Sequence, residues 1–523
     1  DAPRVERTIL LEDQTNADFK RGRLAFNSAK ASSTGTFSCA SCHPDGHTDQ
    51  LLWVLNTPRC DVDGCTQIPP RLTMPIRGLR DTEPYHWDGI PGDPFGGNNT
   101  ASIREDVEPN CELGSPVSCA RFLVDATLRG TMCDQTDCGV NDENKPGKLG
   151  AADREALSEF VLSFPYPPAP ERPFDNALSE KAKAGFLEFN LDQDCGNCHR
   201  MPFLVSTNTP GTGMDAPTWR GAYDRWMILP QGRINVIDLM NIVGMPDHFP
   251  EEEMWKLAGA TDSTWQMVVE SNTGQSGSFG RQITLMANTV DQERSNRVMA
   301  ALEQSAIEEG IVLQGEGRLL TSSQDVSVQF RDGLYREVKA QGRTFSRSDL
   351  LQLVRSGELI ITLTALSGKN VGSDYPQPGV WPLAEIQRQS DVINIPHLQA
   401  DRTLLMNGRH VLEGAAVIVN GRKVNGSIRC QSGTLPHCLD EVILIELERV
   451  PSQGGMHFLQ IQNPAGKFSN DMLFFSDLRS ASPRTGNLIR SGGEFSEGDV
   501  HWRTVELNGT IDFINNRVEA NVS

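Results

Sequence analysis

The 523-residue sequence contains no run of 18 apolar residues, which argues against a transmembrane helix. It is also short of basic residues, because 48 Lys and Arg stand against 68 Asp and Glu and leave a formal net charge of −20. A surface of this sign repels nucleic acid and anionic lipid, and it attracts a basic partner protein. No Gly-rich phosphate loop, zinc-protease motif or nucleophile elbow occurs. These absences exclude the commonest nucleotide-binding and hydrolase motifs.

The length predicts about three or four domains, at roughly 100–200 residues each. The apolar fraction is 38% and the charged fraction 22%, so the chain can bury several cores and is not disordered throughout. It contains 12 cysteines, which are too few for a disulfide miniprotein and many for a cytosolic enzyme. The position of these cysteines is therefore informative.

Four cysteines lie in two copies of the pattern C-x-x-C-H, namely Cys39 to His43 and Cys195 to His199. This pattern is typical of c-type haem attachment, because two thiols at this spacing reach the two vinyl groups of one porphyrin. The histidine that follows then binds the iron. The alternatives are a redox dithiol, which does not need the histidine, and half of a zinc site, which needs a second ligand pair nearby. We expect Cys39, Cys42, Cys195 and Cys198 to hold two haems, with His43 and His199 as iron ligands.

The other eight cysteines form close pairs in stretches rich in Gly, Pro, Asp and Asn: Cys60 and Cys65, Cys111 and Cys119, Cys133 and Cys138, Cys430 and Cys438. They predict four local disulfides, although sequence alone leaves the connectivity open. Disulfides and covalent haem both indicate a periplasmic or extracellular location. No leader precedes Asp1, as expected of a mature or trimmed chain.

Each haem motif follows a helical stretch in which polar residues, a glycine and an apolar pair recur, at residues 17–26 and 180–189. A second element, Pro75 to Gly78 and Pro217 to Gly221, follows each motif, so the chain contains an internal repeat. The Pro-rich stretch 164–170 between the repeats predicts an extended linker. Helical periodicity returns at residues 291–309.

Beyond about residue 310 the pattern changes to short runs in which apolar and polar residues alternate, such as residues 359–364 and 442–447. Asn-Gly pairs, which are typical of hairpins, lie at 407–408, 420–421 and 425–426. Ser346 to Asp349 predicts a capping box at a helix start. The expected fold class is multidomain α+β: two mostly α-helical cytochrome c-like domains followed by a mainly β region with an immunoglobulin-like sandwich.

Residues 15–300 resemble the bacterial dihaem cytochrome c peroxidases and their MauG-type relatives, through the paired C-x-x-C-H motifs, the repeated Pro…Arg-Gly element and the string Pro84 to Gly89. The resemblance implies two cytochrome c-like domains with one haem each. It also implies that Trp87, which matches a tryptophan between the haems, relays electrons. A core aromatic residue is the alternative for Trp87.

The resemblance also implies the distal ligands. We expect His43 and His86 at haem one, and His199 and Met227 at haem two. A thioether ligand raises the potential and a second imidazole leaves it lower. Rival ligands are Met74 and His47 at haem one, and Met201, Met214 and Met240 at haem two. Arg77 and Arg220 are candidates for pairing with haem propionates, or are ordinary surface groups.

The sequence departs from the peroxidase pattern after Trp87. Peroxidases of the family carry a Gln and a Glu downstream, where this chain has Gly97 and Val107, and only Glu105 and Glu108 are close enough to substitute. In the MauG-type enzymes a tyrosine replaces the distal methionine, and here Tyr223 is near. An interdomain Ca²⁺ is common in the family, but residues 61–64 lack the full calcium-loop spacing and favour a solvated turn.

Residues 400–480 resemble an IPT/TIG-type immunoglobulin-like domain, and residues 481–523 resemble the opening strands of a carbohydrate-binding jelly roll or form a closing hairpin. The expected organisation is a first haem domain to residue 170, a second at 171–310, a mixed connecting region at 311–399, then these two β segments. Three functions follow as hypotheses: electron transfer between a low- and a high-potential haem, peroxide reduction at haem one, and a surface or filament assembly component that contacts itself, glycan or protein through its β modules.

Overall fold

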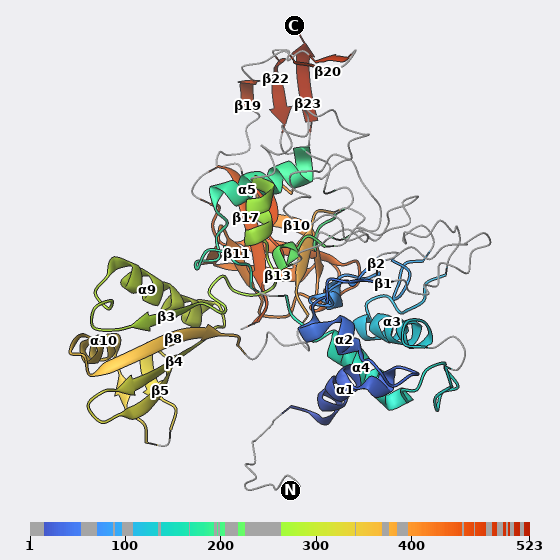
Figure 1. Ribbon diagram of the computed structural model, residues 1–523. Helices are drawn as coiled ribbons and strands as arrows, with labels where there is room; N and C mark the ends of the chain where they lie inside the picture. Colours follow the sequence, from blue (N-terminus) through green and yellow to red (C-terminus); the bar gives the residue numbers. More distant parts are fainter. Residues whose placement is uncertain are drawn as a thin grey trace.

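The computed structural model describes most of the chain, and its parts are arranged as in Figure 1. The described residues are 15–53, 71–86, 89–96, 108–133, 138–166, 168–192, 196, 199–203, 205, 218–224, 263–339, 341–368, 376–383, 396–451, 454–464, 466–476 and five strands between residues 484 and 522.

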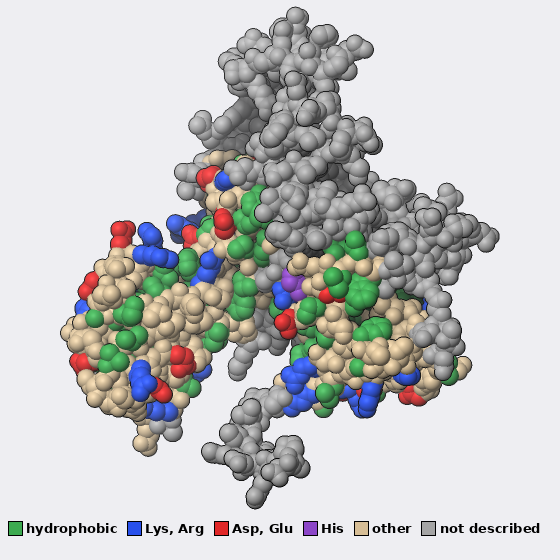
Figure 2. Space-filling model, viewed as in Figure 1, with side chains coloured by type: hydrophobic (Ala, Val, Ile, Leu, Met, Phe, Trp, Pro, Cys, Tyr) green, Lys and Arg blue, Asp and Glu red, His purple; other side chains and the backbone are tan. Residues whose placement is uncertain are grey.

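The fold is a mixture of helices and antiparallel sheets with a β-rich C-terminal part, as the sequence predicts. Every ladder between the described strands is antiparallel. None of the helices in the described ranges is long and apolar enough to cross a bilayer. Side chains of both charge signs are interspersed on the face in Figure 2.

In its described residues, the N-terminal group contains four α-helices and one two-stranded antiparallel ladder. These are α1 (Ala17–Asn27), α2 (Cys39–Cys42), α3 (Pro116–Arg129), α4 (Ala151–Val161), β1 (Leu52–Trp53) and β2 (Arg71–Leu72). The helix α1 begins after Asn16, whose side chain accepts a hydrogen bond from the Phe19 N–H at 2.6 Å. Its backbone lies directly on α4, because a Cβ added at Gly22 would lie 2.1 Å from the Ala156 carbonyl oxygen. Phe26 is buried in the core that these helices share.

The helix that precedes the second motif has the same local features. It comprises α5 (Glu180–Leu187) and a π-helical turn at Glu188–Asp192. It begins after Ser179, whose side chain accepts from the Ala182 N–H at 3.1 Å. A Cβ at Gly185 would lie 1.9 Å from the Ser263 carbonyl oxygen, on the helix at 263–270. The internal repeat therefore extends to capping and to a glycine at a helix crossing.

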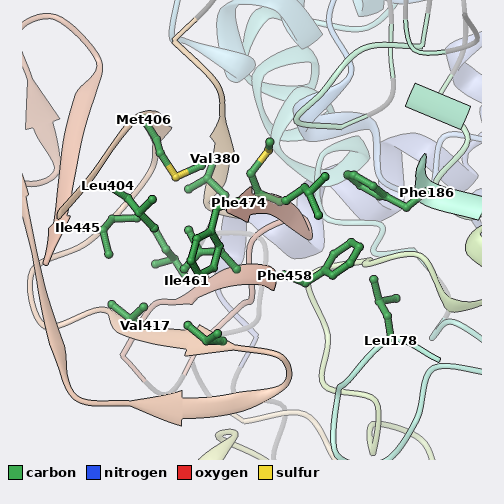
Figure 3. Packing of buried hydrophobic residues seen from close by; sticks show 14 of the residues in the cluster. Leu178, Phe186, Val380, Leu404, Met406, Val417, Ile445, Phe458, Ile461 and Phe474 are labelled. Carbon is green, nitrogen blue, oxygen red and sulfur yellow. The ribbon is translucent and has the colours of Figure 1, made fainter. Parts of the chain in front are cut away.

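The second helical segment nevertheless shares its core with a β-sandwich. Leu178, Phe186 and Phe189 belong to the same buried cluster as the sandwich strands, and the Phe186 ring packs edge-on against Phe458 with centroids 5.3 Å apart (Figure 3). The described residues of the second repeat thus form no separate helical core. The expectation of two independent cytochrome c-like helical domains stays a prediction.

The sandwich consists of two four-stranded sheets. The first sheet has the strand order β13 (Gly426–Cys430), β16 (Val442–Leu447), β10 (Thr403–Arg409), β9 (Gly379–Trp381). The second sheet has the order β12 (Arg422–Val424), β11 (Ala416–Val419), β17 (Gly455–Gln462), β18 (Met472–Ser476). A separate small hairpin consists of β14 (Gly433–Thr434) and β15 (His437–Cys438). Of the three Asn-Gly pairs, only 420–421 closes a hairpin, with φ of 52° and 78°. The hairpin expected at 407–408 is wrong, because these residues lie inside β10, and 425–426 joins strands of different sheets.

In sequence, a six-stranded sheet follows the helical parts and precedes the sandwich. Its order is β3 (Gln282–Leu285), β8 (Leu359–Leu366), β4 (Val312–Leu319), β5 (Gln324–Arg331), β6 (Leu334–Glu337), β7 (Thr344–Phe345), and it packs with α9 (Glu293–Glu308) and α10 (Arg347–Arg355). The capping box at Ser346 and Asp349 is confirmed. Because β3 and α9 belong to this unit, it begins before residue 311, where we expected the second haem domain to end.

The remaining strands lie toward the C-terminus at the top of Figure 1. They form a three-stranded sheet of β19 (Arg484–Leu488), β22 (Leu507–Asp512) and β23 (Arg517–Val522), and a hairpin of β20 (Phe495–Glu497) and β21 (Val500–Trp502).

Three of the four predicted disulfides are present: Cys111–Cys119, Cys133–Cys138 and Cys430–Cys438. Two of them flank α3, and the third links β13 to β15. The fourth pair, Cys60 and Cys65, lies outside the described residues. The prediction of local clamps on loops is confirmed where the structure describes the cysteines.

Candidate functional site

The first C-x-x-C-H motif lies on the wall of a cavity of about 540 Å³. This volume falls in the range of small-molecule and cofactor sites. The short helix α2 presents Cys39 and Cys42 to the cavity, and its first turn is closed by the Ser38 N–H, which donates to the Ser41 Oγ at 3.0 Å. The lining is mostly apolar: Phe26, Phe37, Leu72, Ile76, Leu79, Leu123, Val124, Leu128, Leu157 and Val161 contribute to it.

His43 follows α2 and lies on the same wall. Its Nδ1 lies 3.3 Å from the backbone oxygen of His47. If this contact is a hydrogen bond donated by Nδ1, the other ring nitrogen, Nε2, keeps its lone pair. Burial lowers the pKa of His43, which favours the neutral imidazole. A neutral, oriented imidazole is the form that binds a metal.

The two thiols of the motif are free, and burial raises the pKa of both Cys39 and Cys42 to about 11. A redox dithiol needs a lowered pKa, because the thiolate is the nucleophile. This environment therefore argues against the redox-dithiol alternative. In the part of the chain that the structure describes, no group of three His, Cys, Asp or Glu residues is arranged to hold a metal ion, so a completed zinc site is also not found there.

His86 and Met74 line the same cavity as His43. Burial is the main cause of the lowered pKa of His43, and the charge of His86 lowers it further. His47, by contrast, faces His43 through its backbone oxygen. The structure thus brings His86 and its rival Met74 to the same cavity as the first motif, and their role as ligands stays a prediction.

Arg77 also lines this cavity, and its Nε donates to the Asp45 backbone oxygen at 3.2 Å. In the second repeat, Arg220 is 2% exposed. Its guanidinium carbon lies 4.3 Å from the Phe203 ring centroid and 4.9 Å from that of Tyr166, and its Nη1 donates to the Gln377 side-chain oxygen. Within the described residues its Nε and Nη2 have no hydrogen-bond partner.

A buried guanidinium with two unused donors on one side fits a carboxylate that does not belong to the described residues. Arg77 lines the described cavity and Arg220 does not, and the pairing of either arginine with a haem propionate stays a prediction.

Much of the second motif lies outside the described residues, including Cys195, Cys198 and Met227, and so does Trp87 of the first repeat. His199 is described, and its ring packs against Trp219 with centroids 5.4 Å apart and against Phe189 at 6.1 Å.

Several of the rival and alternative residues can also be placed. Met201 and Tyr223 pack against the sandwich core, which is the behaviour of core side chains. Glu108 is exposed. Glu105, Met214, Met240 and the candidate calcium turn at 61–64 lie outside the described residues.

Sequence reasoning missed Tyr166. The stretch 164–170 was expected to be an extended linker, yet Tyr166 is 7% exposed and lines the cavity. Its ring contacts the Arg-Gly turns of both repeats, because a Cβ at Gly78 would lie 2.0 Å from it and one at Gly221 would lie 2.6 Å from it. Two aromatic residues, Phe164 and Tyr166, within a Pro-rich stretch were the signal that this segment packs and does not merely connect.

Comparison with known proteins identifies no family. No family model matches the chain, and no curated protein matches it. Among solved structures, a chain of hydrazine synthase from Kuenenia stuttgartiensis, pressurised with xenon, aligns over 50% of this chain and 100% of its own length, with 18% identity and a TM-score of 0.34. At this score the likeness carries no argument about fold or function.

Proposed function

We propose that this protein is an exported dihaem c-type cytochrome that transfers electrons between a low-potential haem held by His43 and His86 and a high-potential haem held by His199 and Met227. The observation that carries the proposal is the apolar cavity whose wall contains Cys39, Cys42, His43 and His86 together.

The residues around this cavity fit haem c. Two free thiols with raised pKa values are available for thioether bonds, in which each S–H adds across one vinyl group. Burial lowers the pKa of His43, which favours the neutral imidazole, and its Nδ1 lies near the His47 backbone oxygen. The apolar lining excludes water from the porphyrin faces, which is one of the protein's means of setting a haem potential. When bound, the haem supplies one-electron chemistry, and the chain holds, orients and insulates it.

The second centre is proposed from the repeat. His199 follows the second C-x-x-C-H motif, and Arg220 occupies the position that corresponds to Arg77. The unused donors of the buried Arg220 guanidinium suit a propionate. Methionine at the sixth position raises the potential of this haem above that of a bis-histidine centre.

The cellular setting is proposed from the same features. Three disulfides indicate an oxidising compartment, periplasmic or extracellular. A net charge of −20 favours a basic redox partner protein.

The experiment that tests the proposal is a count of covalent haem. The pyridine haemochrome spectrum of the purified chain should give two c-type haems per chain. Cys39→Ala with Cys42→Ala should leave one, while the matched control Cys430→Ala with Cys438→Ala should retain both, because that pair forms a disulfide in the sandwich. Fewer than two haems in the unaltered chain would show the proposal to be wrong.

The distal ligands are tested separately. Low-temperature magnetic resonance of the oxidised protein should show one His/His and one His/Met low-spin signal. Met227→Leu should lower the potential of one haem only. A large high-spin signal at the first centre, with rapid turnover of peroxide by the reduced protein, would favour a peroxidase instead.

A further inference from the structure

Tyr166 occupies an unusual position between the two repeats. Its ring is 7% exposed and lies against both Arg-Gly turns, at Gly78 and Gly221, whose φ angles are 73° and 69°. Glycine is required at both turns, because a side chain would meet the ring and because this backbone conformation disfavours other residues. The two turns occupy corresponding positions in the two repeats, so the Tyr166 ring contacts the same element of each repeat.

Tyr166 borders the first cavity. On the side of the second repeat, the guanidinium of Arg220 lies over its ring, with the guanidinium carbon 4.9 Å from the ring centroid. The residue before Arg220 is Trp219, whose ring packs edge-on against His199 at 5.4 Å. His199 is the proposed iron ligand of the second haem. A series of contacts and bonds therefore runs from the wall of the first cavity through the Tyr166 ring and the Arg220 guanidinium, then along the chain to Trp219, whose ring contacts His199.

We propose that Tyr166 and Trp219 form the connection through which electrons pass between the two haems. This inference rests on the proposed function. In each transfer one haem iron is oxidised by one electron and the other is reduced by one electron. Neither aromatic ring has a net gain or loss of electrons, and no proton moves.

The physical reason is that electron tunnelling falls steeply with distance and is faster through packed atoms than across gaps. Tyr166 is held in place by the two glycine turns, and the space at Arg220 is filled by Phe203 and Tyr166 on its two sides. The Tyr166 hydroxyl is buried without a hydrogen-bond partner in the described residues. The ring, and not the hydroxyl, is therefore the part that the surroundings fix.

The test is the rate of electron transfer between the haems, measured by absorbance after one electron is injected into the oxidised holoprotein by a light pulse. Tyr166→Met and Trp219→Met keep a side chain of some bulk but remove the ring, and each should slow the transfer by at least an order of magnitude. Tyr166→Phe keeps the ring and should retain the rate. The matched control is Trp381→Met, because Trp381 is a buried sandwich residue outside this series, and it should also retain the rate.

Two further measurements separate the possible outcomes. Haem content and both midpoint potentials are measured in Tyr166→Met, because Tyr166 also lines the first cavity, and the rate is compared at equal haem content after correction for any change in driving force. The double variant Tyr166→Met with Trp219→Met should slow the transfer by less than the product of the two single effects if both residues belong to one connection.

An unchanged rate in Tyr166→Met with both haems present would overturn the inference, as would equal slowing in Tyr166→Phe. If Tyr166→Met loses haem, the other two variants test the connection: Tyr166→Phe should retain the transfer rate and Trp219→Met should slow it, and the opposite result for either would overturn the inference. If Trp87→Met slows the transfer and neither Tyr166→Met nor Trp219→Met does, the connection is wrong and the dihaem function stands. Fewer than two haems in the unaltered protein would instead refute the proposed function itself.

Discussion

Replacing Arg172 with methionine should destabilise the junction between the repeats and the sandwich. Arg172 is 3% exposed, and its guanidinium forms two hydrogen bonds with the Asp471 carboxylate, at 2.7 and 3.0 Å. It also donates to the Gln460 side chain at 3.0 Å and to the Asn176 backbone oxygen at 2.7 Å. The residue lies six positions after Tyr166, so it anchors the same segment to β17 and β18.

The magnitude follows from the charge that is left behind. Methionine fills much of the volume of arginine, but it leaves the Asp471 carboxylate buried without its partner, which costs about 3–5 kcal/mol. With a urea dependence of about 2 kcal/mol per molar, the unfolding midpoint should fall by about 2 M. The exposed Arg422 on β12 allows the same substitution as a matched control, and Arg422→Met should stay within about 0.5 kcal/mol of the unaltered protein.

The assay is urea unfolding of the holoprotein followed by tryptophan fluorescence. Arg172→Met combined with Asp471→Leu should recover part of the loss, because no unpaired charge remains. A loss below about 1 kcal/mol for Arg172→Met alone would refute the reasoning, since it would mean that water reaches Asp471 or that the ion pair does not form.

Three more substitutions test other parts of the structure. Burial raises the pKa of Glu309 from 4.5 to about 7, so the folded protein loses stability as the pH rises from 4.5 to 7. Glu309→Gln should remove this loss, and thermal unfolding at pH 8 should show the variant to be more stable than the unaltered protein by up to about 3 kcal/mol. Equal stability of the two proteins at pH 8 would contradict the burial of Glu309. Gly78→Ala places a methyl group 2.0 Å from the Tyr166 ring and should lower both the melting temperature and the haem content. Gly22→Ala should lower the free energy of unfolding by about 1–3 kcal/mol, because the added methyl group clashes with Ala156. Helix propensity alone would raise the free energy of unfolding by about 1 kcal/mol, so a stabilised variant in urea unfolding would show that α1 and α4 are not in this close contact.

Local features of the fold could be predicted from the sequence because local rules govern them. The helices at α1, α5 and α9 follow apolar periodicity, and the capping box at Ser346 starts α10 where expected. The strands β8 and β16 follow alternation. Cysteine pairs at short separation became disulfides because a short loop already brings the thiols together.

Non-local features could not be predicted in this way. The Asn-Gly pair at 407–408 has the residues of a turn, yet Gly408 lies mid-strand because the Ile443 side chain covers it, and an added Cβ would lie 2.6 Å from that side chain. The pairing of β3 with β8 depends on residues far apart in the sequence. At the candidate site, the motif pointed to the thiols and the imidazole that line the cavity, but the packing of Tyr166 between two turns depends on the tertiary structure.

The two repeats have the same local features, but the helix before each motif packs against a different neighbour. In each, a capped helix with a glycine at a helix crossing precedes the motif, and an Arg-Gly turn follows it. The first helix buries Phe26 among helices, whereas the second buries Phe186 against Phe458 of the sandwich. The sandwich is therefore part of the wall of the second repeat and not an appended module. It follows that a substitution in the sandwich core next to Phe186 also acts on the helix that leads to His199, where the proposed second centre lies.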